Sequence, residues 1–511
     1  MRQLSRRLLL AVIGLFSTGA LFPQQVNTLY FMQNVPVRHV LNPAFIPDAG
    51  MYVSLPLMGY VQFDMGNNSF AFNDLVYHEG DKTITFLDSP ASIRRFYNTL
   101  KPTTVLRANF RTSIISAGFR WGGCFWNFSV DSRFQGMVGL PRDAFRVSLF
   151  GTTEGFDNRF DFAALQSDLT CYTQFVLGMA KQLDSRLTCG VKLKYLAGSA
   201  NISSRNKDLS MNGGDGKWKF SGVGSINESS PVAFDFPGFQ SFSYELPDGF
   251  TGLLKPSGAG AGIDVGVDYR MNGRVGLSAA LTDLGFIHWH RNPRNISYNS
   301  SFVFGGISPF TDTARTETLN GIYDALIVGN ILVDSILGQF DKSMHVSGAS
   351  RSYYTSTTST VNLGVEYHLF PGKLSLGVLT RVHAYKKTIT GEVTASVNAR
   401  PFKWLGSSLG YSFLNGNLNT VGAGFSLGMG CVNCFLAADY LFFEKVDFPL
   451  STIHPSFPGM KVPIPYRSNV LNLSAGVNIL LGLPGSYGPG RTSRNGLHRP
   501  AGPRNCRCDW D

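Results

Sequence analysis

The sequence predicts an all-β fold, a transmembrane antiparallel up-and-down β-barrel of about 14 strands. Long segments alternate between apolar and polar side chains, as strands with two different faces do. The connections between these segments are alternately short and long, which is typical of outer-membrane barrels. The chain also contains 56 Gly, 40 Phe and 19 Tyr but only 15% charged residues, a composition that favours strands over helices.

Residues 1–20 have the pattern of a secretory signal peptide. Three arginines precede a short apolar core, Leu8 to Phe16, and small residues up to Ala20 offer a cleavage site. The apolar core is too short to span a membrane, and no later stretch provides the roughly 18 uninterrupted apolar residues that a helical span needs. A secreted chain of this kind can still enter a membrane as a closed β-barrel.

Residues 21–50 are expected to form an N-terminal hatch segment inside the barrel. The part from about residue 25 onward has no long alternating pattern, yet it is too apolar for a solvated tail. Its prolines suit a path that is neither helix nor sheet. The lumen can bury such side chains and also satisfy an irregular backbone, whereas the alternative is packing under the periplasmic rim. The candidate hatch or ligand residues are Asn42, Pro43, Ala44 and Phe45, with Asn42-Pro43-Ala44 near the deepest point.

Residues 51–482 are expected to form the barrel. Its strands run about 10 to 14 residues, which is long for a soluble sheet but suits a tilted membrane strand. The expected strands lie near 52–64, 104–121, 123–137, 169–182, 186–198, 259–270, 274–289, 353–369, 373–386, 389–400, 404–414, 418–430, 433–445 and 466–482. The long connections alternate with short ones along most of the chain, which predicts that both ends of the barrel lie in the periplasm.

The stretch GAGAGIDVGVDYRMNGRVGLSAAL, residues 258–281, shows how the two faces are told apart. Its glycines look like a phosphate-binding loop, but no helix follows them, and that motif requires one. The side chains instead alternate on both sides of Asn272-Gly273, which is a strong signal for a hairpin turn. The apolar set is expected to face lipid and the glycine-rich polar set the lumen. The expected lumen-facing polar residues, here and in two later strands, are Asp264, Asp268, Arg270, Glu366, His368 and Arg381.

The long external loops contain two expected helices, near residues 90–100 and within 319–340, where apolar residues recur at helical spacing. These helices either pack over the mouth of the barrel or form an apolar ligand groove there.

The sequence contains no signature of catalysis or of a resident metal or cofactor. The two Gly-x-Ser-x-Gly matches, at residues 406–410 and 424–428, lie inside expected strands and so form no strand-to-helix elbow, and there is no His-Glu-x-x-His helix. We therefore expect no enzyme activity, no catalytic residues, no metal site and no cofactor. His368 and His383 could face the lumen beside Glu366 and Arg381, but a lumen lined with mixed charge is the better interpretation. The formal net charge is +11, but no cluster of basic and aromatic residues occurs in the body of the chain, so nucleic acid is not an expected partner.

Four stretches of the chain resemble a known family. They are NTLYFMQNVPVRHVLNPAF, LPLMGYVQFDMGNNSFAFNDLVY, GAGIDVGVDYRMNGRVGLSAALTDLGFIHW and NLSAGVNILLG, which together run from about residue 25 to 482. The chain resembles the outer-membrane long-chain fatty-acid transporter family of Gram-negative bacteria, and more closely a group of outer-membrane barrels known only as a domain of unknown function. Asn42-Pro43-Ala44 is similar to a motif in the N-terminal hatch of the transporters. This resemblance implies a fourteen-stranded barrel with an N-terminal segment inside it, and passage of apolar molecules.

The end of the chain departs from that family. Residues 483–511 continue after the last expected strand, and their Gly, Pro and Arg content predicts a disordered basic tail in the periplasm.

Two functions remain open for a barrel in the bacterial outer membrane. The first is passive uptake or passage of hydrophobic or amphipathic small molecules, with outer-membrane lipid around the barrel. The alternative is a structural or secretion-associated assembly barrel that binds another cell-envelope protein. We expect a transporter to contain an apolar cavity and an exit past the hatch, and an assembly barrel to contain a filled lumen and an external surface for its partner.

Overall fold

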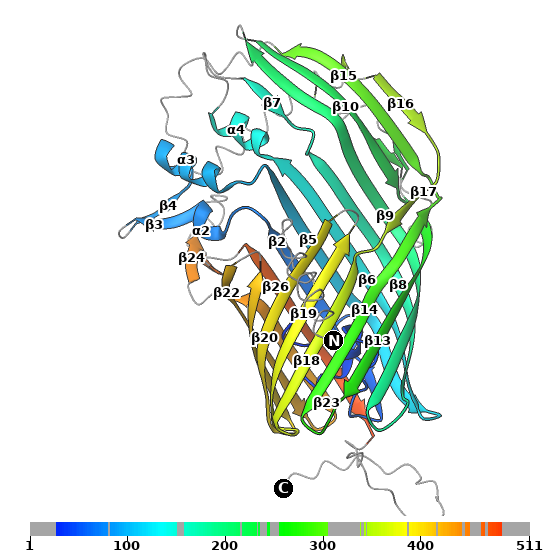
Figure 1. Ribbon diagram of the computed structural model, residues 1–511. Helices are drawn as coiled ribbons and strands as arrows, with labels where there is room; N and C mark the ends of the chain where they lie inside the picture. The colour runs from blue at the N-terminus through cyan, green and yellow to red at the C-terminus, as the bar shows by residue number, and fades with distance from the viewer. Residues whose placement is uncertain are drawn as a thin grey trace, which may run out of the picture.

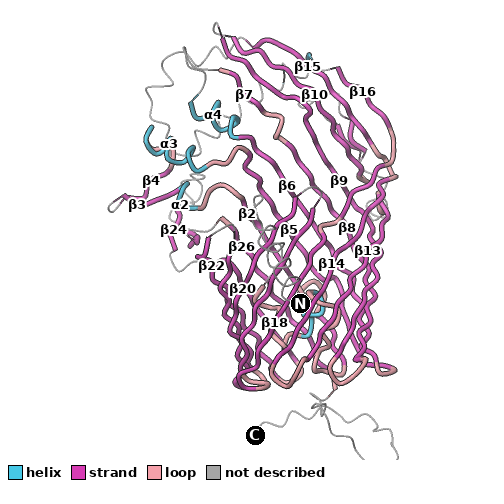
Figure 2. Tube along the Cα trace, viewed as in Figure 1, coloured by secondary structure: helices cyan, strands magenta, loops and turns pink. Residues whose placement is uncertain are grey.

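The structure is a computed structural model, shown in Figures 1 and 2, in which a closed barrel carries a taller sheet on one side of its rim. The residues it describes are 27–79, 82–150, 158–214, 217–231, 233–235, 243–245, 255–304, 338, 342–343, 345–385, 388–414, 417–441, 445–449, 461–465 and 469–482.

The barrel is a closed antiparallel sheet of 14 strands, as the sequence predicts. Its first position is made by two short strands, β1 (Met51–Ser54) and β2 (Val61–Asn67), and both pair with β5 on one side and β26 on the other. The remaining barrel strands are β5 (Thr103–Trp121), β6 (Cys124–Pro141), β8 (Gln166–Gln182), β9 (Leu187–Gly214), β13 (Gly258–Arg270), β14 (Val275–Trp289), β18 (Ser359–Phe370), β19 (Leu374–Tyr385), β20 (Thr388–Phe402), β21 (Leu405–Leu414), β22 (Asn417–Met429), β23 (Val432–Leu441) and β26 (Val470–Leu481).

Residues 55–60 interrupt the first strand, which the sequence pattern suggested was continuous. Pro56 has no N–H to donate, and Leu57 has a positive φ of 61°. The segment keeps isolated backbone hydrogen bonds to its neighbour, such as Val477 N to Met58 O at 2.9 Å. Leu57 and Met58 therefore project from the outer face of the wall, where both are more than half exposed.

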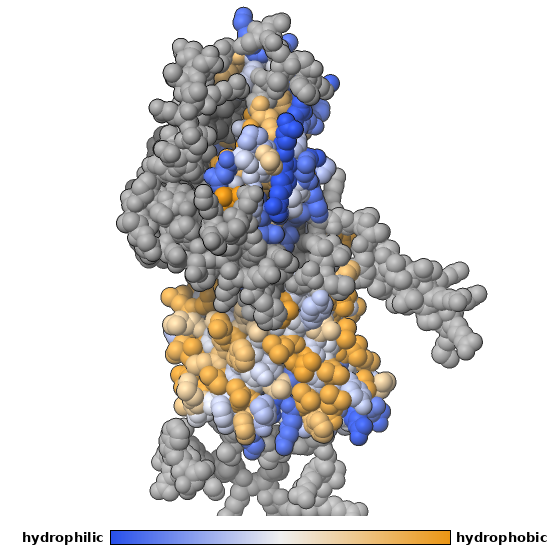
Figure 3. Space-filling view, turned by 90° about the vertical axis from the view of Figure 1, so that its left-hand side faces the viewer, coloured by the Kyte–Doolittle hydropathy of each residue, from blue (hydrophilic) through white to orange (hydrophobic). Residues whose placement is uncertain are grey.

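The outer face of the barrel is apolar over a continuous belt, which Figure 3 shows as orange side chains around its lower half. Val265 and Val267 are 42% and 39% exposed, although both lie in the middle of a paired strand. Gly266 lies between them on the opposite face, where it meets the N-terminal segment. The apolar set thus faces outward, which makes the fold a transmembrane β-barrel. Among the described residues, every helix is too short or too polar to cross a membrane.

One side of the barrel extends far beyond its rim. β9 is 28 residues long, and its second half pairs with β10 (Lys217–Ser229), which pairs with β15 (Arg294–Phe304), which pairs with β16 (His345–Ala349). We call this four-stranded sheet the extension. These segments were expected to be long loops, because stretches such as residues 203–213, SSRNKDLSMNG, are rich in polar side chains. β10 and β15 nevertheless have one apolar face, on which Phe220 and Phe304 pack with Met211 in a buried cluster.

Further short elements lie around the rim and along the extension, where β7 (Arg159–Asp161) pairs with β9. The helices are α2 (Phe72–Leu75), α3 (Pro90–Thr99) and α4 (Arg142–Phe150). The other small strands are β3 (Val76–Glu79), β4 (Lys82–Thr85), β11 (Ala233–Asp235), β12 (Ser243–Glu245), β17 (Tyr353–Ser356), β24 (Lys445–Pro449) and β25 (Lys461–Pro465). α3 is the helix predicted near residues 90–100, and the Ser89 hydroxyl caps it by accepting from Ser92 N at 3.1 Å. The second predicted helix, within 319–340, lies outside the described residues apart from residue 338.

The orientation of β13 can be tested with lysine substitutions. A lysine at Val265, in the belt, should destabilise the folded barrel in lipid vesicles by about 2–4 kcal/mol, because its charge would lie in hydrocarbon. The control, Met271→Lys, is exposed just beyond the end of the same strand and should cost roughly 0–1 kcal/mol. Denaturant unfolding from vesicles measures both, and equal costs would contradict the orientation.

Candidate functional site in the barrel lumen

Residues 27–50, which we call the plug, lie inside the barrel near its short-turn end (Figure 2). They form tight turns and one 3-10 helix, η1 (Pro36–Val40). The plug supplies much of a buried apolar cluster that also includes wall residues such as Tyr52 and Phe435. The buried apolar plug residues in that cluster are Leu29, Tyr30, Phe31, Met32, Val35, Val37, Leu41 and Phe45. The apolar side chains that appeared too hydrophobic for a solvated tail are therefore buried against the wall.

Glycines in the wall allow the plug to approach the strands closely. A Cβ at Gly266 of β13 would overlap the side chain of Asn42, and one at Gly190 of β9 would overlap the backbone of Pro43. A Cβ at Gly377 of β19 would likewise lie only 2.5 Å from the ring of Phe31. Gly266 of the stretch GAGAGIDVGVDYR, together with Gly190 and Gly377, thus provides a surface for the plug.

Asn42 connects the plug to two wall strands. Its Nδ2 lies 3.3 Å from the carbonyl oxygen of Val267 and 3.4 Å from that of Ala279, while its Oδ1 accepts from Ala44 N at 3.0 Å. Tyr30 adds another contact between plug and wall, because its hydroxyl lies 3.0 Å from Ser278 Oγ. Pro43, Ala44 and Phe45 are buried with Asn42, so the four candidate residues form one contiguous contact with the wall.

The first residues of the plug are bound by a strand from late in the sequence, β23. Asp439 of β23 accepts hydrogen bonds from the backbone N–H groups of Asn27 and Thr28 and from the Thr28 hydroxyl. Arg381 of β19 donates to the Asn27 side chain, and its Nε donates to Asn362 Oδ1 at 2.7 Å. Asn362 in turn donates to the Leu41 carbonyl oxygen at 2.9 Å, so one network joins Asn27 to Leu41 of the plug.

His39 makes the third attachment of the plug. Its Nε2 lies 2.6 Å from the Tyr52 hydroxyl, and its Nδ1 lies 2.8 Å from Lys192 Nζ. Tyr52 continues the chain to Ser116 Oγ at 3.0 Å. Burial, together with the positive charges of Lys192 and Arg111, holds the pKa of His39 well below its ordinary value. The neutral imidazole can therefore accept a hydrogen bond from Lys192 while its other nitrogen donates to Tyr52.

A buried layer of ion pairs crosses the lumen. Lys194 Nζ lies 2.6 Å from Asp264 and 2.5 Å from Asp283, and Arg133 lies 2.8 Å from Asp283. A second pair, Arg111 with Asp131 at 2.6 Å, lies on the neighbouring strands β5 and β6. Of these residues only Asp264 was a sequence candidate, because the others follow no motif and meet only when the sheet closes.

The six predicted lumen residues lie in different parts of the structure. Asp264 lies in the ion-pair layer and Arg381 in the plug network, and both are almost fully buried. Glu366 accepts from Ser375 Oγ at 2.6 Å and lies 3.4 Å from Gln33 Nε2 of the plug. His368 is beside it, with 3.7 Å between its Nε2 and Glu366 Oε2.

The last two predicted lumen residues lie near the turn end of β13. Asp268 is partly buried, whereas Arg270 is exposed at the last position of the strand. The six residues therefore do not form a single cluster. No group of three or more His, Cys, Asp or Glu suited to a metal ion occurs among the described residues.

Described residues line two cavities in the lumen, and both cavities are small. One, of about 30 Å³, lies between the plug and the wall near Phe31 and Ser375, and another, of about 20 Å³, lies near Asp64 and Arg133. Each holds at most a water molecule or two.

Comparisons with known proteins agree with the resemblance noted in the sequence. The model of one family, described as "Family of unknown function (DUF5723)", matches residues 43–439. No curated protein matches the sequence. The similar solved structures include a Pseudomonas aeruginosa FadL homologue, with 11% identity, 91% of this chain and 100% of that chain covered, and a TM-score of 0.39.

Two further solved structures have similar values. The P. putida toluene transporter TodX has 9% identity, 91% and 97% coverage and a TM-score of 0.37. The Ralstonia pickettii toluene transporter TbuX has 11% identity, 90% and 96% coverage and a TM-score of 0.31. At these identities and scores the likeness carries no argument about what the chain binds.

The contact between plug and wall can be tested at Gly266. A valine there should cost roughly 1–3 kcal/mol of stability, because its side chain would overlap Asn42 and Pro43. Gly276→Val on β14, where a Cβ has open space, should change stability by no more than about 0.5 kcal/mol. Thermal unfolding in detergent measures both, and a harmless valine at 266 would show that the plug does not pack there.

Acid should loosen the plug. The folded-state pKa of His39 is depressed, so below about pH 6.5 the released or unfolded state binds a proton that the docked state does not. The stability contributed by docked His39 is thus complete above that pH and is lost as the pH falls toward the depressed value. The hydrogen-exchange protection factors of residues 27–50, which are corrected for the intrinsic effect of pH on exchange, should fall between pH 7.5 and 5.

Two variants identify the group responsible for the acid effect. His39→Gln should reduce the pH dependence of exchange, whereas His290→Gln, at an exposed site on the extension side, should retain it. Equal pH dependence in both variants would exclude His39 as the sensor.

Proposed function

The chain belongs to the family of unknown function (DUF5723), and we propose that it is an outer-membrane passage for apolar or amphipathic small molecules, closed by its own N-terminal segment. The single observation that carries this proposal is the position of the plug, which is bound to the wall inside a membrane-spanning barrel. In this proposal residues 1–20 are a signal peptide that directs the chain across the inner membrane of a Gram-negative bacterium. Residues 21–50 are the hatch, residues 51–482 the barrel, and residues 483–511 a periplasmic tail.

The need for a moving plug follows from the size of the cavities. The lumen cavities of about 20 and 30 Å³ are far smaller than the roughly 300–1,000 Å³ of a small-molecule site. A molecule can therefore pass only when residues 27–50 shift or leave. Polar contacts from a few side chains hold the plug, among them Asn42, His39 and Asp439, and such contacts can be exchanged for water.

The chemistry of the plug favours apolar cargo. Its buried face carries Tyr30, Phe31, Leu41 and Phe45, and their release would uncover an apolar surface beside a polar wall. An amphipathic molecule could cover that surface and meet the charged layer at the same time. A purely polar solute would gain nothing from the exposed rings and would leave them in water.

A disulfide between plug and wall tests the proposal directly. A Cβ at Gly424 of β22 would lie 2.8 Å from the Cγ2 atom of Thr28, so cysteines at these two positions are within reach of a disulfide. The pair is introduced after the seven native cysteines are changed to serine. We expect the oxidised barrel to exclude the apolar dye N-phenylnaphthylamine from intact cells, and reduction to restore entry at least tenfold.

Two controls accompany the disulfide. Thr28→Cys alone should show no redox effect, and deletion of residues 25–45 should raise single-channel conductance in planar bilayers. A folded deletion barrel with unchanged conductance, or an oxidised barrel that still admits the dye, would contradict passage through the lumen.

A second function, a structural or assembly barrel that binds another envelope protein, is favoured by one observation. Two lumen cavities that described residues line measure only about 30 and 20 Å³, while β16 pairs only with β15 in the described sheet and leaves an outer strand edge. Such an edge can add a strand from a partner. Under this function the oxidised, locked barrel would keep its full activity in cells, which distinguishes it from the first.

A further inference from the structure

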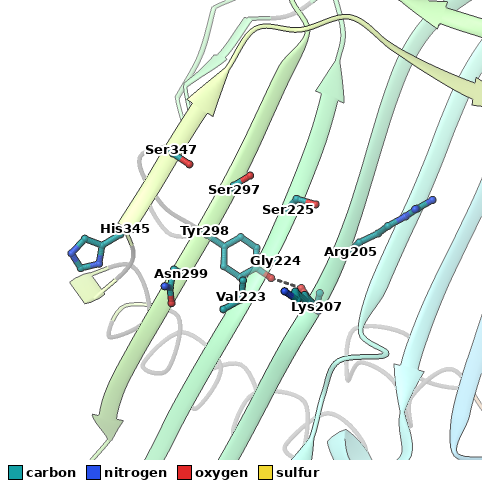
Figure 4. Close-up of a pocket in the computed structure, with 11 residues that line it drawn as sticks. Arg205, Lys207, Val223, Gly224, Ser225, Ser297, Tyr298, Asn299, His345 and Ser347 are labelled. Atoms are coloured by element: carbon teal, nitrogen blue, oxygen red, sulfur yellow. Dashed lines mark hydrogen bonds between the residues drawn. The ribbon is translucent and has the colours of Figure 1, made fainter.

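The extension carries a polar hollow that plays no part in the proposed passage. Described residues from β9, β10, β15 and β16 line it, and its volume is about 480 Å³ (Figure 4). Figure 3 shows hydrophilic residues gathered on this part of the molecule above the apolar belt. The hollow is large enough for a small-molecule ligand.

The register of the extension aligns its polar side chains in rows. Arg205 pairs with Ser225, Ser225 with Ser297, and Ser297 with Ser347, so these side chains share one face of the sheet. Neighbouring strands lie roughly 4.8 Å apart, which makes the row about 14 Å long. The next row on the same face contains Asn299 and His345, which pair with each other.

Three further lining residues, Asn206, Gly224 and Tyr298, alternate with the residues of the rows along their strands. Tyr298 lies against Gly224, where a Cβ would meet its ring at 2.5 Å, and its hydroxyl donates to Asn206 Oδ1. The register shifts between Val223 and Gly224, which adds Lys207 to the hollow as an extra residue on β9.

The polar side chains of this face have no partners. Within the part of the chain that the structure describes, none of the following makes a side-chain hydrogen bond or an ion pair: Arg205, Lys207, Ser225, Ser297, Asn299, His345 and Ser347. Elsewhere in this protein charged side chains that face the lumen are paired, as Lys194 and Arg133 are. A row of unpaired groups around a hollow is what a binding site for a polar ligand needs.

The donors and acceptors define the ligand. Arg205 and Lys207 can only donate, which suits a carboxylate, sulfate or phosphate group. Serine hydroxyls and the Asn299 amide can both donate and accept, which suits the hydroxyl groups of a sugar. The described lining contains no Asp or Glu, and Asp208, which pairs with Val223, is not part of it. We propose that this hollow binds an acidic saccharide, with its anionic group at Arg205 and Lys207 and its hydroxyls along the serine row.

Calorimetry on the full-length barrel in detergent tests this proposal with three probes. Tetragalacturonate carries acid groups on a sugar backbone, maltotetraose is its neutral counterpart, and inorganic phosphate is an anion without a sugar. We expect tetragalacturonate to bind at least tenfold more tightly than either of the others, and its affinity to fall as salt rises. Equal binding of the two saccharides, full competition by phosphate at similar affinity, or no binding of tetragalacturonate would overturn the proposal.

Substitutions assign the site to these residues. The double variant Arg205→Gln with Lys207→Gln should weaken tetragalacturonate binding at least tenfold, and Ser297→Val should weaken it about threefold. The matched control is Lys219→Gln, which removes a positive charge from an exposed position on the same face of β10 but outside the hollow. Loss of binding in Lys219→Gln to the same degree would show that overall charge is responsible. Circular dichroism verifies that each variant is folded.

Discussion

The pairing of the last strand with the first is the interaction on which the rest of the structure depends. β26 pairs with both β1 and β2, so the barrel sheet has no open edge in the membrane. This closure creates an interior that is shielded from lipid and lined by the polar, glycine-rich face of every strand. Only in such an interior can the irregular backbone of residues 27–50 be buried, because lipid offers its N–H and carbonyl groups no partner.

The charged layer gives this interior a defined arrangement. Lys194 contacts two aspartates and Arg133 shares one of them, so the positive and negative charges are matched across four strands. Loss of one member of such a buried group leaves another charge uncompensated, which typically costs about 3–5 kcal/mol. The layer therefore resists rearrangement. The plug beside it is held both by neutral side chains, such as Asn42 and Tyr30, and by charged wall residues, such as Asp439 and Arg381.

The local sequence predicts the strands whose residues alternate between two environments, lipid on one face and the lumen on the other. Val265, Gly266 and Val267 alternate because one face of β13 meets lipid and the other meets the lumen, and that pattern is visible without any partner. The α3 helix begins at Ser89-Pro90, a local capping signal. The strands of the extension were not recognised, because the polar run at residues 203–213 interrupts the alternation that β10 and β15 show around Phe220 and Phe304.

The candidate site was predictable only in part. The composition of residues 25–50 indicated burial, and Asn42 to Phe45 do contact the wall. Their partners could not be found from the sequence, because Asp439, Lys192 and Asp283 are ordinary polar residues in separate strands. Which of the lumen residues meet depends on strand stagger and on closure, and neither is encoded within a single segment.

The attachment of Thr28 to Asp439 has a consequence for how the molecule is assembled. The two residues are separated by 411 positions, so the plug is among the first segments to be synthesised but one of its anchors is among the last. Contacts of such long range form slowly, because the intervening chain must be ordered before they can stabilise anything. An incomplete barrel therefore has no site for Thr28, and the lumen can be sealed only after β23 is in place. Until then the apolar residues of the N-terminal segment have no lumen in which to be buried, so the oldest end of the chain is the part that stays exposed for longest.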